Sequence, residues 1–219
     1  MIKIFVESGV NDARQHGKRT TNEQDFIEKV ISLYFPKKEF GKDYLVVVVG
    51  VGWTNLPNIV SECKQNTDDG GNNLVVFDAD TSQNSGGFIK RKEEIEVLKK
   101  QEELDFGLFL WPDNCSDGDF EMLLSQIINE KHRCLLDCFE KFEKDIRAHD
   151  PKEEKYITPG RKAKMYTYLD LHKKSGIEQE MIKKGFGLFN NSEYWNLNAE
   201  AISPLVDFFV RYFGTTTEI

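Results

Sequence analysis

Short apolar runs separated by polar turns dominate the first half of the chain. Residues 2–6, 44–49, 72–77 and 106–111 are rich in Val, Ile, Leu and Phe. Runs of this length, bounded by Gly, Pro, Asn or Asp, are typical of buried β-strands. Between them, apolar residues recur every three or four positions, which is the period of an amphipathic helix. The alternation predicts an α/β fold: a mostly parallel four-stranded sheet with helices on both faces.

Three helices are predicted between these strands. The first runs from about residue 23 to 34 and is stopped by Pro36, and the second runs from about 56 to 64. The third spans about 88–103, and the many opposite charges on its outer face predict a partly solvated helix. Residues 8–22 are polar and lack an apolar period, so we expect a long loop of the kind that often carries function.

From about residue 131 the pattern becomes entirely helical, with an amphipathic segment at 134–146, a second helix at 161–176 and an apolar helix, expected to be buried, at 202–213. We therefore expect an α/β domain over residues 1–130 and a C-terminal helical extension over residues 131–219 that packs on it. Aromatic side chains at helical spacing favour a core role over a base-stacking surface. They are Tyr166, Tyr168, Trp195, Phe208, Phe209 and Tyr212.

The formal net charge of −8 restricts how this chain could meet nucleic acid. An acidic protein repels phosphate at long range, so contact with DNA or RNA requires a local basic patch or a metal ion. Basic residues cluster at 90–92 and at 161–164, and a solvated helix face is the simpler explanation for the first cluster.

No apolar run approaches the roughly 20 residues that a membrane span requires, and the N-terminal segment turns polar too soon for a secretory signal. We expect no membrane association and a cytoplasmic protein. The four cysteines form no CxxC pair, so reduced thiols are expected rather than a zinc site or disulfides.

Acidic residues stand where two of the predicted strands end. Glu7 ends the first strand, and Asp78 and Asp80 end the third. The carboxyl ends of parallel strands share one edge of the sheet, and residues two apart on a strand point the same way. Two carboxylates held together need a cation or a shared proton. Hard ions such as Mg²⁺ take oxygen ligands of this type.

A second acidic pair follows the fourth strand. Asp117 and Glu121 are four residues apart, a spacing that would place them on one face near the start of a helix. Taken singly, each acid would more often be a helix cap or a surface residue. Together they predict a divalent-metal site at the sheet edge, with the candidate ligands Glu7, Asp78, Asp80, Asp117 and Glu121.

These motifs resemble a known family. The residues IFVE at 4–7 and VVFDAD at 75–80 resemble the TOPRIM domain, the topoisomerase and primase module that also occurs in overcoming-lysogenisation-defect (OLD) nucleases. Three later segments are similar to stand-alone bacterial TOPRIM-related proteins whose function is not established: FLWPDNCSDGDFEMLL, KAKMYTYL and YWNLNAEAISPLVDFF. The resemblance covers most of the chain and implies a TOPRIM or Rossmann-like sheet.

The resemblance also implies Mg²⁺- or Mn²⁺-dependent phosphodiester chemistry on DNA or RNA. By the family pattern, Glu7 would be the general acid or base and a metal ligand, while Asp78 and Asp80 would hold the ion. This makes a nuclease or a related phosphotransfer enzyme the expected activity.

Further residues match the family by position. Asp117 and Glu121 stand where extra acids could hold a second ion, and Lys162 or Lys164 could neutralise charge that develops in the transition state. The resemblance does not decide between one ion and two.

The chain departs from the TOPRIM pattern at two places. Ser8 replaces a glycine, and the next acid is either Asp12 or Glu23, depending on whether residues 8–22 are an insertion. Ser82 stands where topoisomerases have a third aspartate, so strand cleavage through a tyrosine intermediate is not expected.

Two other functions stay open at this point. The sequence VVFDADTS also fits the strand end of haloacid-dehalogenase-like phosphatases, with Asp78 as nucleophile and Asp80 as acid. That family begins from this strand, whereas here two βα units precede it. The second is a non-catalytic binding or regulatory module on a TOPRIM scaffold. A protein partner and the oligomeric state are left open.

Overall fold

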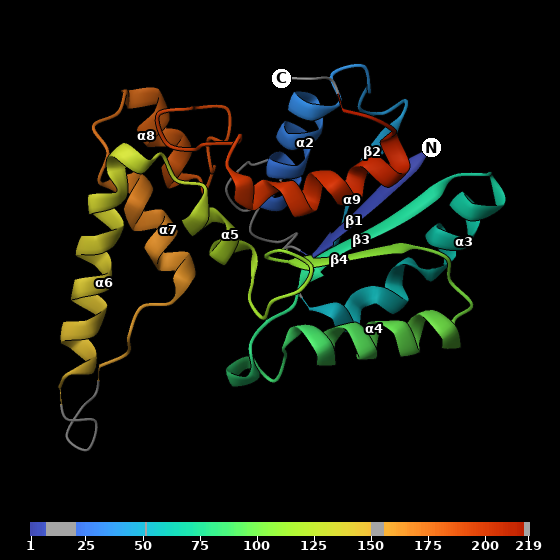
Figure 1. The fold of residues 1–219 in the computed structure, drawn as a ribbon, viewed down its shortest axis with the longest axis horizontal. Helices are drawn as coiled ribbons and strands as arrows, with labels where there is room; N and C mark the ends of the chain where they lie inside the picture. The colour runs from blue at the N-terminus through green and yellow to red at the C-terminus, as the bar shows by residue number, and fades with distance from the viewer. Residues whose placement is uncertain (8–20, 51, 150–155, 217–219) are drawn as a thin grey trace.

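A computed structural model of the protein describes residues 1–7, 21–50, 52–149 and 156–216. Its centre is one sheet of four parallel strands in the order β2-β1-β3-β4 (Figure 1). The strands are β1 (Ile2–Glu7), β2 (Tyr44–Gly50), β3 (Asn72–Asp78) and β4 (Gly107–Trp111). The predicted α/β class is confirmed, and the sheet is parallel throughout. All four strands therefore end at the same edge.

Helices cover both faces of this sheet (Figure 1). The helices α2 (Asn22–Tyr34) and α9 (Ser203–Phe213) pack on one face, against side chains such as Ile4 and Val76. The second face is covered by α3 (Val60–Asp68) and α4 (Phe88–Gln101), which pack against side chains such as Phe5 and Val75. Successive strand residues point to opposite faces, so apolar residues at consecutive positions build both layers.

The boundaries of α2 follow from local chemistry. Thr21 is the N-cap: its side chain accepts a hydrogen bond from the amide of Gln24, whose side chain accepts one from the amide of Thr21. The helix ends at Tyr34, two residues before Pro36, which confirms the predicted stop within a residue.

The helices on the second face differ in detail from the prediction. The segment expected as a helix from 56 to 64 is a 3₁₀-helix over Trp53–Ile59 that continues into α3. Helix α4 buries only Arg91 and Ile95, so the predicted solvated outer face is confirmed. The burial of Arg91, which is charged, was not expected.

Among the described residues of the second half, further α-helices precede α9: α5 (Phe120–Gln126), α6 (Arg133–Arg147), α7 (Arg161–Asp170) and α8 (Gly176–Lys183). The single helix predicted over 161–176 is wrong, because α7 ends at Asp170 and α8 begins at Gly176. Ser175 and Glu178 form a capping box that starts α8, and this S-x-x-E signal was present in the sequence.

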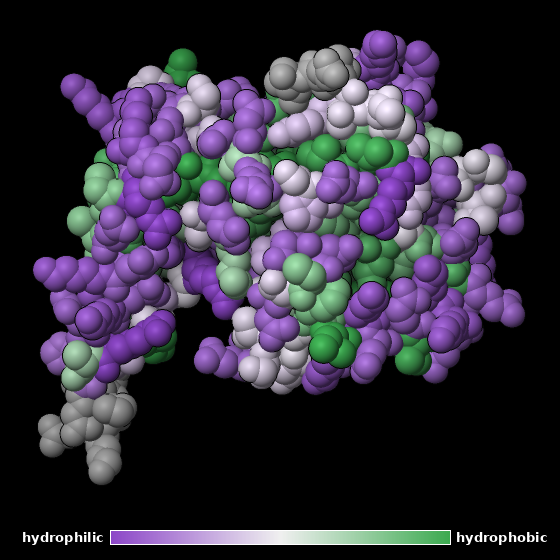
Figure 2. All heavy atoms as spheres, in the orientation of Figure 1, coloured by the Kyte–Doolittle hydropathy of each residue, from purple (hydrophilic) through white to green (hydrophobic). Residues whose placement is uncertain are grey.

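One hydrophobic core joins the C-terminal helices to the sheet. The ring of Phe208 lies 5.5 Å from that of Phe109 on β4, and Phe213 lies 5.8 Å from Tyr44 on β2. On the face shown in Figure 2, hydrophilic residues cover most of the surface, and apolar atoms gather beneath α9 where it meets the sheet. The core role predicted for the aromatics is confirmed for four buried members: Tyr168, Trp195, Phe208 and Phe209.

Within the described ranges, no helix has the length and apolar character needed to cross a membrane.

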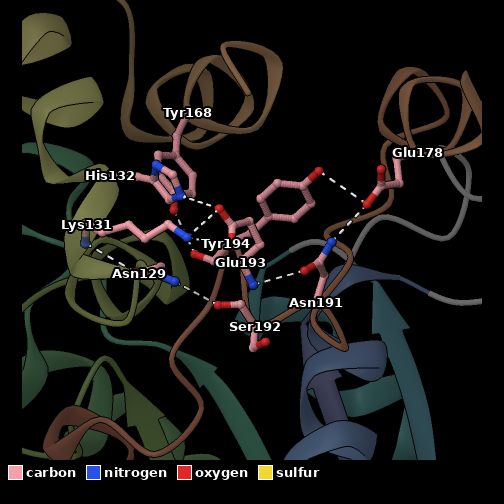
Figure 3. A network of polar contacts seen from close by, with 9 residues as sticks. All are labelled: Asn129, Lys131, His132, Tyr168, Glu178, Asn191, Ser192, Glu193 and Tyr194. Carbon is pink, nitrogen blue, oxygen red and sulfur yellow. Dashed lines mark hydrogen bonds and ion pairs between the residues drawn. The ribbon is translucent and has the colours of Figure 1, made fainter. Parts of the chain in front are cut away.

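A polar network fastens the segment 191–194 to residues 129–132, which precede α6, and to α7 and α8 (Figure 3). The carboxylate of Glu193 lies 2.7 Å from Lys131 Nζ and 2.9 Å from His132 Nε2. The hydroxyl of Tyr168 donates to the carbonyl of Tyr194 at 2.7 Å. The network holds the helical region together through side chains that come from four different segments.

His172 lies next to this network without sharing in it. Its ring packs edge-on against His132, Tyr168 and Tyr194, with centroid distances of 4.4, 4.8 and 4.7 Å. Its Nε2 is buried and has no hydrogen-bond partner among the described residues. Burial, and then the positive charges around it, lower the pKa of His172 to about 4. The folded protein therefore favours the neutral ring.

We expect His172 to make the fold sensitive to acid. The folded pKa is about 4 and the ordinary value is 6.5, so the unfolded chain binds more protons between these values. Stability is then lost as pH falls from about 6.5 towards 4. Urea unfolding should show wild type losing about 2 kcal/mol more than His172→Phe over this interval. His149→Gln, at an exposed position, is the control and should behave like wild type. Parallel pH profiles for wild type and His172→Phe would contradict the prediction.

Candidate functional site

The acids that end β1 and β3 lie side by side at the sheet edge. The two strands are paired, with Val6 opposite Val76. Glu7 directly follows Val6 and Asp78 lies two residues after Val76, so the two acids stand at the ends of neighbouring strands. Each is close enough to a second acid to feel its charge: Glu7 raises the pKa of Asp78, and Asp80 raises the pKa of Glu7. The structure thus brings Glu7, Asp78 and Asp80 into one region.

Glu7 accepts a hydrogen bond from the turn that follows β2. The amide of Gly52 donates to Glu7 Oε1 at 2.7 Å, and Gly52 has a φ of 88°, which favours glycine. Burial raises the pKa of Glu7 to about 7, although the Gly52 hydrogen bond opposes this rise. A carboxyl group with this pKa can both take up and release a proton near neutral pH.

Asp78 is held from the opposite side of the edge. Its Oδ1 accepts a hydrogen bond of 2.9 Å from the amide of Phe120, the first residue of α5. Burial, followed by the charges of Glu7 and Glu121, raises the pKa of Asp78 well above its usual range. Carboxylates in this situation favour protonation unless a cation balances them.

Asp80 departs from the strand geometry. Strand β3 ends at Asp78, and Asp80 has a left-handed backbone with a φ of 59°. The alternation that we used to align the two aspartates therefore does not extend to Asp80. Its Oδ2 instead accepts a hydrogen bond of 2.7 Å from Nη2 of Arg91 on α4.

Asp117 lies in the loop ahead of α5, which corrects its expected place on that helix. Helix α5 begins at Phe120, so Asp117 precedes the helix and does not share a face with Glu121. Its exposed carboxylate accepts a hydrogen bond of 2.7 Å from the amide of Phe88, at the start of α4. Asp117 thus caps a helix, the structural role that isolated acids often have.

Glu121 does lie near the other acids. Burial raises its pKa to about 7, and the charges of Asp119 and Glu23 act in the same direction. Glu23 also raises the pKa of Asp78. Of the two acids considered after Glu7, Glu23 is therefore the one that the structure places near the group, whereas Asp12 lies outside the described residues.

The two candidate lysines have different surroundings. Lys162 is exposed at the start of α7, and its charge lowers the pKa of Glu121. Lys164 lies 2.6 Å from Glu140 on α6, so an ion pair with a different helix occupies it. Lys162 is the better placed of the two for a role at the acids.

Asp119 lies beside the acids and was not among the residues predicted for the site. Asp119 caps α5 by accepting a hydrogen bond from the amide of Met122, and it lies 2.6 Å from Arg161 Nη1. This ion pair connects α7 to the sheet edge. An aspartate directly before an apolar helical stripe is an N-cap signal and could have identified Asp119.

A divalent ion fits the chemistry of these acids, with one restriction. In the part of the chain that the structure describes, no three His, Cys, Asp or Glu side chains gather as ligands of one ion. Mg²⁺ commonly uses one or two carboxylates and completes its shell with water and substrate phosphate. Glu7 and Asp78 supply two such hard oxygen donors, and a cation would relieve their mutual repulsion.

The fold and the site define a parallel α/β protein with half-buried acids at the carboxyl edge of its sheet. The chain belongs to the family described as "Protein of unknown function (DUF3226)", whose model matches residues 21–214. No curated protein and no solved structure matches the chain.

Proposed function

We propose that this protein carries out Mg²⁺- or Mn²⁺-dependent phosphodiester chemistry on nucleic acid, as a nuclease or a related phosphotransfer enzyme. The observation that supports it most is the pairing of β1 with β3, which brings the half-buried acids Glu7 and Asp78 together. The resemblance of IFVE and VVFDAD to the TOPRIM domain supports the same activity.

Each side chain of the site has a separate role in this proposal. A bound ion would supply positive charge for the attacked phosphate and for an activated water. Asp78 and Glu7 would hold that ion, and the pKa of about 7 also suits Glu7 to proton transfer. Lys162 would neutralise charge that develops on the phosphate in the transition state.

Attraction of the substrate must come from local charge, because the chain as a whole is acidic. The first turn of α7 carries Arg161 and Lys162, and both lie within electrostatic reach of the acids. In this arrangement the backbone phosphates would lie between the start of α7 and the carboxyl edge of the sheet.

The test is a cleavage assay with divalent ions. We expect Mg²⁺ or Mn²⁺ to support nicking of supercoiled DNA or cleavage of single-stranded RNA, and a chelator to stop it. Asp137→Asn is the matched control, because it removes a carboxylate at an exposed position of α6, where that carboxylate pairs with Arg133, and it should leave cleavage in place.

Two results would contradict the proposal. One is the absence of cleavage together with no Mn²⁺ binding by calorimetry, which would favour the non-catalytic module. The other is hydrolysis of phosphate monoesters with a beryllofluoride adduct on Asp78, which would favour the phosphatase.

A further inference from the structure

Arg91 is a buried cation at the edge of the proposed site. Its side chain is only 6% exposed, although it arises from the mostly solvated helix α4. Nη2 lies 2.7 Å from Asp80 Oδ2, and Nη1 lies 2.9 Å from Glu94 Oε2. The guanidinium also lies over the ring of Trp53, at 5.3 Å from its centroid. Buried charges are costly unless paired, so these contacts fix the side chain.

The backbone around Asp80 leaves only its side chain free to turn. The carbonyl of Asp80 accepts a hydrogen bond from Gly118, and the carbonyl of Ala79 accepts one from Gly87. A Cβ atom at Gly86 would overlap the Cβ of Asp80, so the loop passes directly against Asp80. A change of ligand at Asp80 is therefore a rotation of its carboxylate.

Arg91 is too buried to reach a substrate phosphate, with only 6% of its side chain exposed. Both terminal nitrogens bind carboxylates, and Nε is buried without a hydrogen-bond partner among the described residues. Its charge nevertheless reaches the site, because Arg91 lowers the pKa of Glu7. This combination indicates a cation that acts on the acids rather than on a phosphate.

We propose that Arg91 is a positioning residue, an internal counter-cation that holds Asp80 until a divalent ion takes its place. Asp80 would then turn from Arg91 to the ion, and Arg91 would keep its second partner, Glu94, which lies three residues along the same helix. This inference rests on the proposed function, since it concerns the ion that Glu7 and Asp78 would hold.

The experiment is Mn²⁺ titration calorimetry on the full chain. Arg91→Gln removes the competitor for Asp80 and should bind Mn²⁺ about tenfold more tightly than wild type. Glu94→Gln removes the charge of the second partner of Arg91. Arg91 should then hold Asp80 more strongly, so this variant should bind Mn²⁺ more weakly than wild type. A purely structural role would not move the affinity in opposite directions.

Matched controls separate this exchange from general charge effects. Lys92→Gln and Glu93→Gln make the same charge changes at exposed positions of α4, and both should stay within about twofold of wild type. If Arg91→Gln does not fold, as judged by circular dichroism, Glu94→Gln decides alone: weaker Mn²⁺ binding supports the inference and unchanged binding overturns it.

The remaining outcomes separate the two proposals. If wild type binds Mn²⁺ and the Arg91 and Glu94 variants bind it equally well, only the role of Arg91 is overturned. Unchanged Mn²⁺ affinity with weaker nucleic-acid binding in Arg91→Gln also overturns it, in favour of a phosphate contact. If neither wild type nor Arg91→Gln binds Mn²⁺, the inference and the proposed function fail together.

Discussion

Replacing Asp78 by Asn should abolish metal-dependent cleavage and make the metal-free protein more stable at pH 8. The loss of activity should be at least about 100-fold, because the variant removes a charged side chain that we propose as a ligand of the ion. The gain in stability follows from burial: Asn keeps an oxygen that can accept the hydrogen bond from Phe120 and carries no charge. We expect about 1–2 kcal/mol at pH 8.

The sign of the pH dependence follows from the direction of the shifts. The pKa values of Glu7, Asp78 and Glu121 are all raised in the folded protein, so the folded state binds more protons than the unfolded state from about pH 4.5 to about pH 7. The stability that these groups contribute is therefore lost as pH rises through this window. Asp78→Asn should show a smaller loss than wild type in urea unfolding at pH 5 and pH 8.

Asp113→Asn is a control in which the expected change in stability has the opposite sign, because the pKa of Asp113 is lowered in the folded protein and that of Asp78 is raised. Hydrogen bonds from Ser116 and Cys115 lower the pKa of Asp113, so its charge stabilises the fold and the variant should lose stability at pH 8. If Asp78→Asn is less stable than wild type at pH 8, or if it still cleaves nucleic acid, Asp78 does not have the role assigned to it.

Truncating Phe209 to Ala should cost about 3–5 kcal/mol of unfolding free energy. Phe209 is 0% exposed, lies on α9 and belongs to the same hydrophobic cluster as the strands. Its loss leaves a cavity that surrounding side chains fill only in part. The variant should unfold at a much lower urea concentration, in one transition that includes the sheet.

Asp207→Ala is the matched change on the exposed side of α9 and should shift stability by no more than about 0.5 kcal/mol. A cost below about 1 kcal/mol for Phe209→Ala would show that α9 is peripheral. Separate transitions for the sheet and the helices would show that residues 131–219 form an independent unit, in conflict with the continuous core.

The strands could be predicted well because their signal is local. Buried parallel strands are short runs of apolar residues, and the turn residues that bound them are equally visible, so β1 and β2 agree with the prediction to within a residue. The division of the second half into helices was less accurate, since the break between α7 and α8 depends on a cap at Ser175 that we overlooked.

The acids of the site were only partly predictable. Glu7 and Asp78 could be paired because the order of parallel strands places their ends together, a consequence of topology. The predicted helix face shared by Asp117 and Glu121 was wrong because it depended on where a helix begins, and the helix begins three residues after Asp117, at Phe120. Spacing alone does not distinguish a residue on a helix from one that precedes it.

By itself, the sequence determined the α/β class, the apolar layers of the sheet and the presence of acids at strand ends, since each follows from periodicity along the chain. Only the tertiary structure decided the partners of those acids. Arg91 belongs to a basic cluster whose neighbours point to solvent, and its burial beside Asp80 depends on the packing of α4 under the loop that follows β3. Contacts between residues far apart in the chain depend on how the elements pack in three dimensions, and no local pattern records them.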